Sequence, residues 1–519
     1  MKSDDKLHSL IKSLTPPEKG YFKKLSASKQ VFNKGENYVR LFEAIERMKE
    51  YDESKLKSEF RKEKFIIQLG VAKKYLYHQI LASLASYHSE TSERLALNNL
   101  FDEFYVLFER GLHDQALSVL RTIKSNIEDN GLSRYRLAEV LHYEKFVKPN
   151  DSQEIISEKL KSVNEQENKL YEELKNISDY HYLGHCFSTL KNKTTVIRTA
   201  GQLAELREFM SHPLLSQVGN AESDTARLYF YMLNSMYCLR VVEFDKSFEM
   251  SSMMVKTFEE MQKGKKSNLE KLSNIYHEFL FICSCTGRHK ELKEEVKKYR
   301  ALLSGESKHK SKVVVNNLYD SYIFELKANI YLGKPELNFE VVKKLEDELG
   351  KHKSLIIMTH TLEKHYYVAM THVIFGNYNE ALECTNQILT IPEVKNQYVD
   401  FFIKISILNL IIHFELGNIE LVISLIRSIY YFMGKQEYPL GIEREIIAFF
   451  RKLSGVNNNK QLTELFRELS CRIRVLAKDP FERYAYDDLD LIMKYLESKV
   501  DGRLLEEIMR REFLKSFKR

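Results

Sequence analysis

The feature that most constrains this chain is its shortage of the residues that make turns. It has only 19 glycines and 8 prolines among 519 residues, about 5% where average usage is roughly 12%. β-Sandwiches, barrels and doubly wound α/β folds use such residues in their many turns, so the shortage argues against all three. Because 44% of the residues are hydrophobic, with 30 Phe and 30 Tyr, a disordered chain is also excluded. We therefore expect an all-α protein.

A recurring pattern predicts that the helices come in pairs. An apolar helix ends at a glycine and an amphipathic helix follows at once, most clearly in residues 366–393. The apolar residues of the second helix there lie on one side of a helix with 3.6 residues per turn. They are Tyr378, Ala381, Leu382, Thr385, Ile388 and Leu389.

The turns recur at a regular spacing. They are expected at Gly111, Gly287, Gly333, Gly376 and Gly417, of which the last four are 46, 43 and 41 residues apart. The 176 residues between the first two correspond to four steps of about 44, and one step should fall near residue 243, where no glycine stands. Such a period indicates stacked helix pairs, because each pair can bury its apolar side only against its neighbours.

Two segments carry resemblances to known families. The run Gly376–Leu382, and Gly111–Leu117 in the same way, resembles the turn of a tetratricopeptide repeat. This implies a right-handed α-α superhelix, although the repeats of about 41–46 residues exceed the 34 of that family and most of its signature positions are absent. Residues 13–29 and 73–81 resemble a group of uncharacterised helical proteins from Bacteroidota, which implies a bacterial source and an architecture but no activity.

The charge distribution and the loop-like residues suggest three parts. Residues 1–89 contain 18 Lys and Arg against 11 Asp and Glu, whereas the rest of the chain is nearly balanced at 61 against 62. We expect a basic N-terminal helical module (1–89), a tetratricopeptide-like repeat array (90–455) and a C-terminal helical cap (456–519). A heptad-like pattern between Ile156 and Ile177 indicates a long helix packed on its neighbour or, alternatively, a dimeric coiled coil.

The resemblance also implies where a ligand would bind. In tetratricopeptide arrays the first helix of each pair contacts ligands through its fifth and ninth positions. With the turn glycine at position fifteen, these positions are Phe101, Tyr105, His277, Phe281, Ile323, Lys327, Tyr366, Met370, Ile407 and Ile411. Lys327 is the single lysine among them and none is Asn, so the carboxylate-binding type of that family is not expected. Two alternatives stay open: a tight superhelix buries these side chains, or they line an apolar groove that grips a helix or peptide.

The sequence contains none of the common catalytic motifs, such as a phosphate-binding loop or a nucleophile elbow. We expect a protein that is not an enzyme, with no catalytic residue, metal or cofactor, and that acts as a scaffold for a protein or peptide partner. The alternative is a nucleic-acid-associated regulator that uses the basic module, with the repeat array as sensor. Its candidate contacts are Lys12, Lys19, Lys23, Lys24, Lys29, Lys73 and Lys74. In the competing interpretation, these lysines are ordinary surface residues and the module only caps the repeat array.

Two features favour a soluble, cytoplasmic protein without a membrane partner. The most apolar stretch, residues 401–416, has 16 residues and contains Lys404 and His413, whereas a membrane-spanning helix needs about 20 apolar residues. The first residues carry charges where a signal peptide needs an apolar stretch. The six cysteines lie in apolar helical patterns, which is typical of reduced, buried thiols.

The fold class makes a direct spectroscopic prediction. We expect a circular dichroism spectrum dominated by helix, at a fraction above about 65%, roughly twice the globular average. A clear sheet contribution in the spectrum would contradict the all-α assignment and the repeat pattern built on it.

Overall fold

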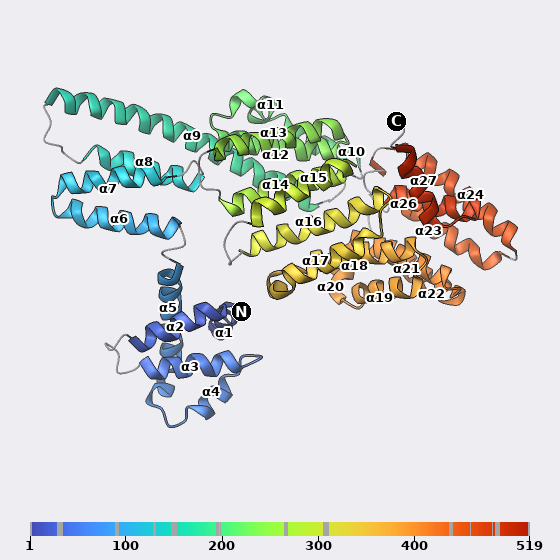
Figure 1. The fold of residues 1–519 in the computed structure, drawn as a ribbon, viewed down its shortest axis with the longest axis horizontal. Helices are drawn as coiled ribbons and strands as arrows, with labels where there is room; N and C mark the ends of the chain where they lie inside the picture. The colour runs from blue at the N-terminus through green and yellow to red at the C-terminus, as the bar shows by residue number, and fades with distance from the viewer. Residues whose placement is uncertain are drawn as a thin grey trace. The chain divides into compact units, whose positions relative to one another are not determined.

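The computed structural model describes residues 3–28, 35–88, 93–127, 131–146, 153–193, 197, 199–263, 268–304, 311–434, 440–456, 458–479, 481–482 and 488–516. Helices make up 86% of these residues and none of them lies in a strand (Figure 1), so the predicted all-α class is confirmed. The chain divides into two compact units, Met1–Tyr171 and Glu172–Arg519. The three domains predicted from the sequence stay a prediction.

The first part of the N-terminal unit is a small helical module with its own core. Its helices are α1 (Ser3–Ser13), α2 (Pro16–Ser28), α3 (Gly35–Arg47), α4 (Glu53–Glu59), the 3₁₀ helix η1 (Lys64–Gln68) and α5 (Leu69–His88). The core is formed by fully buried side chains such as Ile11, Phe42 and Leu76. At the start of α2 the Glu18 carboxylate accepts hydrogen bonds from the amide and hydroxyl of Thr15, at 2.7 and 2.8 Å, which ties down the free end of the helix.

The second part of this unit contains a helix pair and two further helices. These are α6 (Glu93–Glu109), α7 (His113–Asn126), α8 (Gly131–Glu144) and the beginning of α9 (Gln153–Lys193). The predicted long helix is present, since α9 is continuous over 41 residues. It interrupts the 44-residue period because no turn falls inside it. The positions of its heptad-like pattern are buried from Glu167 to Ile177. The Glu167 carboxylate forms an ion pair with Lys145, which follows α8.

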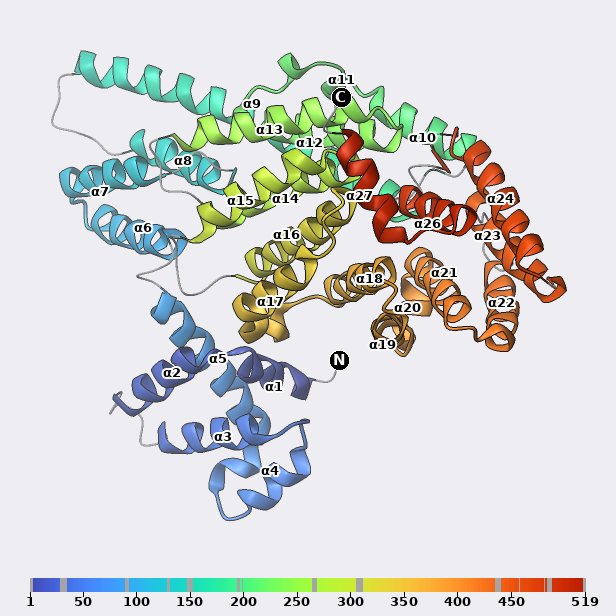
Figure 2. The ribbon, with the colours of Figure 1, turned by 45° about the vertical axis from the view of Figure 1, so that its right-hand side comes forward.

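The second unit consists of consecutive helix pairs, as both views show (Figures 1 and 2). It begins with the end of α9, α10 (Ala200–Met210), α11 (Pro213–Ser216) and η2 (Val218–Asn220). The pairs are α12 (Asp224–Arg240) with α13 (Phe244–Gln262), α14 (Leu269–Cys285) with α15 (His289–Ser304), α16 (Lys312–Tyr331) with α17 (Leu337–Leu349), α18 (Met358–Ile374) with α19 (Tyr378–Leu389), and α21 (Val399–Glu415) with α22 (Ile419–Met433). Short elements η3 (Gly350–Leu355) and α20 (Pro392–Gln397) connect them, and α23 (Gly441–Lys452), η4 (Leu453–Gly455), α24 (Asn459–Leu476), α26 (Leu489–Asp501) and α27 (Leu505–Ser516) follow.

The predicted turn glycines all adopt the left-handed backbone conformation that glycine tolerates best. Their φ angles lie between 64° and 75°. In each turn, the amide after the glycine donates a hydrogen bond to a carbonyl five residues earlier, as from Asn377 to His372 at 2.9 Å. This is the bonding pattern that closes a helix end and redirects the chain. The five glycine turns are therefore confirmed.

The turn expected near residue 243 is also present, without a glycine. Val242 has a φ of 65°, and the Glu243 amide donates to the Cys238 carbonyl at 2.8 Å. A β-branched residue in this conformation is strained, because its Cβ crowds the backbone. Among the described residues the same turn is built at seven places. Six have a glycine, namely the five predicted ones and Gly502, and one has Val242, which does not fit.

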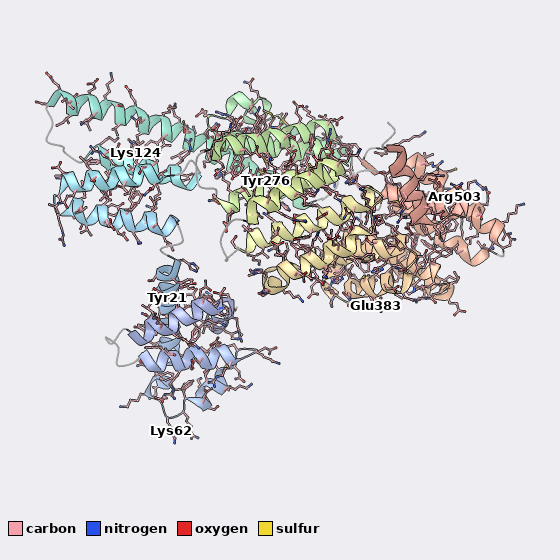
Figure 3. The ribbon with its side chains drawn as sticks, viewed as in Figure 1. Tyr21, Lys62, Lys124, Tyr276, Glu383 and Arg503 are labelled. Carbon is pink, nitrogen blue, oxygen red and sulfur yellow. The ribbon has the colours of Figure 1, made fainter. Side chains whose placement is uncertain are left out.

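The first helices of the pairs (α12, α14, α16, α18 and α21) pack on one another in chain order. They share one continuous core, in which Tyr276 of α14 is fully buried, whereas Glu383 of α19 is exposed; both are labelled in Figure 3. Ala381 of α19 is also completely buried and lets α18 and α19 approach closely. The cysteines depart from the expectation, because Cys471 is exposed while Cys238 and Cys283 are buried.

The strained turn predicts opposite outcomes for two exchanges. Val242→Gly relieves a strain of about 1–2 kcal/mol, offset by roughly 0.5–1 kcal/mol of extra backbone entropy in the unfolded chain. We therefore expect unchanged or slightly higher stability. Gly376→Val introduces the same strain and should lower the free energy of unfolding by about 1–2 kcal/mol. Urea unfolding followed by circular dichroism measures both; equal destabilisation by the two variants would contradict this account.

Candidate functional site

The ten positions expected to contact a ligand are mostly covered. Phe101, Ile323, Lys327, Tyr366, Met370, Ile407 and Ile411 are buried. Tyr105, His277 and Phe281 are half-buried. Burial is the first of the two alternatives left open by the sequence. Four of the ten, however, come together in one place.

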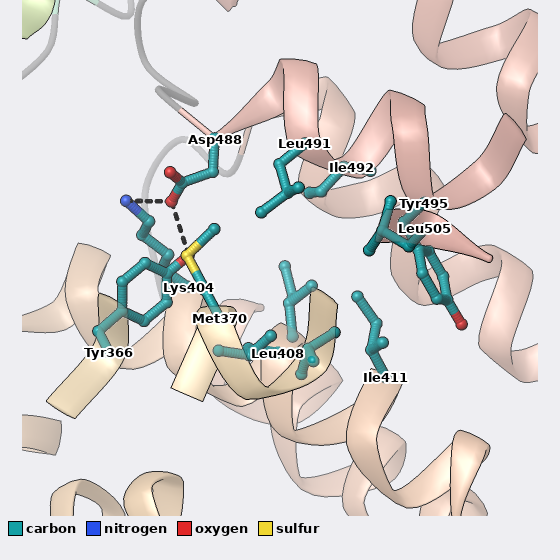
Figure 4. Close-up of a pocket in the computed structure, with 12 residues that line it drawn as sticks. Tyr366, Met370, Lys404, Leu408, Ile411, Asp488, Leu491, Ile492, Tyr495 and Leu505 are labelled. Carbon is teal, nitrogen blue, oxygen red and sulfur yellow. Dashed lines mark hydrogen bonds and ion pairs between the residues drawn. The ribbon is translucent and has the colours of Figure 1, made fainter. Parts of the chain in front are cut away.

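These four residues line a cleft between α18 and α21 on one side and the C-terminal helices on the other. Tyr366, Met370, Ile407 and Ile411 lie there. Figure 4 shows Tyr366, Met370 and Ile411 opposite the side chains of α26 and α27. The other lining residues are Val373, Lys404, Leu408, Asp488, Leu491, Ile492, Tyr495 and Leu505. The cavity inside has a volume of about 40 Å³, so the two sides do not close completely on each other.

One end of the cleft is polar because three helices bring hydrogen-bond donors to the same carboxylate. Asp488, which is 1% exposed, accepts from the Tyr366 hydroxyl at 2.6 Å and from the Tyr331 hydroxyl at 3.2 Å. The Lys404 ammonium lies 2.5 Å from the same carboxylate and above the Tyr366 ring, 4.7 Å from its centre. A buried carboxylate needs such charge-assisted bonds to offset the water it has lost.

At the other end of the cleft the roles are exchanged, since the carboxylate belongs to α21 and the hydrogen-bond donors belong to α26. Glu415, the last residue of α21, accepts from the Tyr495 hydroxyl at 2.5 Å and from the Lys499 ammonium at 2.6 Å. Burial, and then the neighbouring Glu415 carboxylate, raise the pKa of Tyr378 as well as that of Tyr495. Both phenols therefore keep their protons and can donate. The helix α26 is thus held on the first helices by one carboxylate on each side.

A second buried polar group joins three neighbouring first helices. Asp320 of α16 accepts from His277 of α14 at 2.8 Å and also contacts Nδ1 of His360 on α18. Burial by itself raises the pKa of Asp320, but the two histidines outweigh it and the net pKa is lowered. The carboxylate therefore stays charged and ties the three helices together.

The three histidines of α18, His360, His365 and His372, are half-buried. The His360 side chain is only 12% exposed, and burial, followed by the charge of Lys364, lowers the pKa of His365 to about 4. Among the described residues no group of three or more His, Cys, Asp or Glu side chains could hold a metal ion. Within the same described part, no helix combines the length and apolarity that crossing a membrane requires.

Three of the seven candidate nucleic-acid contacts, Lys19, Lys23 and Lys73, are paired with carboxylates of their own module. Lys19 lies 3.1 Å from Glu46, and Lys23 lies 3.0 Å from Glu43 and 3.5 Å from Glu46. Lys12 donates to the backbone carbonyl of Glu46 at 2.7 Å.

The remaining lysines of this set differ in their surroundings. Lys73 is buried and binds Glu53 and the Tyr51 hydroxyl, both at 2.8 Å. Lys24 and Lys74 are exposed, whereas Lys29 lies outside the described residues. The positive charge at Lys19, Lys23 and Lys73 is therefore offset locally, and these three do not form a basic surface.

Sequence reasoning missed the polar end of the cleft. Asp488 stands in an acidic stretch that a helix start explains sufficiently, and only the fold brings it to Tyr331, Tyr366 and Lys404. No local pattern links residues so far apart in the sequence. Of this group, Tyr366 alone stood among the expected ligand positions.

Comparison with known proteins gives no further assignment. No protein-family model matches the chain, and no curated protein matches its sequence.

The paired lysines predict that the intact chain does not bind duplex DNA or RNA at about 50 mM salt, where electrostatic attraction is strong. Fluorescence anisotropy with a labelled duplex measures this. Binding at this salt concentration would contradict the prediction. The bound phosphates would be assigned to the module if replacing Lys19, Lys23 and Lys24 by Glu reduced the magnitude of the log–log salt slope by about two to three, since each phosphate contact contributes about −0.7 to −0.9.

Proposed function

We propose that the protein is a non-enzymatic helical-repeat scaffold that binds another protein or a peptide. The helix pairs of the second unit would form a right-handed superhelix of the tetratricopeptide type, with long repeats. The observation that carries the proposal is the cleft beside α18 and α21. Four positions that the resemblance assigns to ligand contact, Tyr366, Met370, Ile407 and Ile411, line this one cavity.

The chemistry of the cleft suits an apolar side chain of a partner. Among the twelve lining residues the only charged groups are Lys404 and Asp488, and these lie 2.5 Å apart. The rest of the lining is aliphatic, with Met370 and two tyrosines. An apolar side chain entering such a site removes apolar surface from water, worth about 25 cal/mol per Å², while the neighbouring polar groups fix the orientation of the partner.

The nucleic-acid alternative gains no comparable support. It requires a basic face on residues 1–89, and the pairing of Lys19, Lys23 and Lys73 with Glu46, Glu43 and Glu53 leaves less positive charge than the composition suggests.

A variant that fills the cleft tests the proposal. Leu408→Trp places a large ring among the lining residues, whereas Leu421→Trp puts the same ring on α22, where the native side chain is 43% exposed. Both chains are used as bait in extracts of the native cell, and the captured proteins are quantified by mass spectrometry. We expect at least one protein to be captured by the wild type and by Leu421→Trp but reduced about tenfold or more with Leu408→Trp.

Overpacking alone could lower stability by about 1–3 kcal/mol, so the thermal unfolding of both variants is measured beside the capture. Equal capture by the two variants, with both folded at the assay temperature, would show that the cleft does not contact the partner.

A further inference from the structure

The helix α26 contacts the first helices through the Asp488 carboxylate at its start and through apolar side chains that line the cleft. Tyr331, Tyr366, Lys404 and the apolar cleft form a surface that is here called the acceptor surface. We infer that the acceptor surface binds a helix with a carboxylate at its start, and that α26 is its internal ligand. An acidic amphipathic helix of a partner competes with α26 for this surface. The inference deepens the proposed function and rests on it.

The acceptor surface supplies a carboxylate site that does not depend on α26. Its three donors come from three different helices, Tyr331 from α16, Tyr366 from α18 and Lys404 from α21. Two phenols and an ammonium that converge within 2.5–3.2 Å of one carboxylate satisfy an anion better than they would satisfy a neutral group. The chemistry of the site therefore selects a carboxylate.

Asp488 serves this site instead of its own helix. It stands at the N-cap of α26, where an aspartate normally accepts a hydrogen bond from the first turn. Its side chain makes no such capping bond and points to the acceptor surface instead, as Figure 4 shows. The carboxylate thus contributes to the contact between the helices and not to the start of α26.

The apolar residues of α26 follow the carboxylate with the spacing of a helix bound in a groove. Leu491, Ile492 and Tyr495 are three, four and seven residues after Asp488, and all three line the cleft. Anchors at these intervals lie on one side of a helix. The acceptor surface therefore fits a helix with an acidic residue followed by apolar residues at +3, +4 and +7.

Two observations indicate that α26 is not the best possible occupant. The cavity of about 40 Å³ stays between it and the acceptor surface, so packing contacts are missing there. In addition, burial and then the charges of Lys327 and Lys494 lower the pKa of His289 to about 3. Lys494 belongs to α26 and adds positive charge beside His289, in a region that already contains Lys327. A partner helix without a lysine at this position, or with an acid there, would bind with less repulsion.

The test measures competition with a peptide of known sequence. A fluorescent peptide with the sequence of residues 486–503 is titrated with the full-length wild type and with Asp488→Asn and Asp488→Lys chains. We expect tighter binding to the variants in that order, with a gain of about tenfold or more for Asp488→Lys, because its lysine lies beside Lys404 and releases α26. Asp490→Lys is the matched control, since it makes the same charge change at an exposed position of the same helix, and should bind like the wild type.

Two further arms examine the acceptor surface itself. A peptide with Asn in place of Asp488 should bind the Asp488→Lys chain about tenfold more weakly than the acidic peptide. A peptide with Glu in place of Lys494 should bind it more tightly. Tyr366→Phe in the Asp488→Lys chain should weaken the acidic peptide while the helix content of the chain, measured by circular dichroism, stays unchanged.

The inference is overturned if the Asn peptide binds as well as the acidic one, or if releasing α26 brings no gain in affinity. Hydrogen exchange of residues 224–304, remote in sequence from α26, confirms that each variant is folded; if Asp488→Lys fails this check, Asp488→Asn decides. None of these measurements needs the natural partner. If the peptide competition fails while capture still depends on Leu408, the internal-ligand inference is wrong and the proposed scaffold function stands. If the competition succeeds but capture does not depend on Leu408, the proposed scaffold function is wrong.

Discussion

The central constraint on the second unit is that α16, in the middle of the stacked first helices, is covered on nearly every side. In α16, 15 of 20 residues are buried, so a polar side chain there must find its partner inside the protein. Asn316 bonds the Leu355 carbonyl and the Ile357 amide, and Asn329 bonds Asn338, which in turn donates to Thr371. These bonds tie the pair of α16 and α17 to the following helix α18. Asp320 and Asp488 are charged residues that make buried polar contacts of the same kind. At the candidate site the packing around Asp488 is incomplete, because a cavity of about 40 Å³ remains there.

Much of the architecture follows from local sequence because its turns are local. A glycine with positive φ needs only its own helix end and the next residues, so Gly111, Gly287, Gly333, Gly376 and Gly417 are readable from spacing alone. Val242 was located by the period although its residue type gives no signal. The 41-residue helix α9 breaks the period because its apolar pattern continues where a turn would be expected, and regular spacing between distant glycines does not reveal that.

The site could be predicted only in part, since it depends on contacts between distant segments. The repeat pattern leads to Tyr366, Met370, Ile407 and Ile411, which line the cleft, but not to what lies opposite them. Net charge is similarly incomplete as a guide. Residues 1–89 contain an excess of seven basic side chains, yet Glu46 alone lies within 3.5 Å of both Lys19 and Lys23. Composition gives the number of charges, whereas the field depends on which of them are neighbours.

The contact between Tyr331 and Asp488 spans 157 residues of chain. Ribosomes add roughly 5–20 residues per second, so on the order of 10–30 s pass between the synthesis of these two partners. During that interval the helices α16, α18 and α21 can pair and stack, while Tyr366, Met370, Ile407 and Ile411 have no C-terminal helix to cover them. The nascent chain therefore exposes an apolar surface for many seconds, and the helices that cover it, α26 and α27, are synthesised only afterwards.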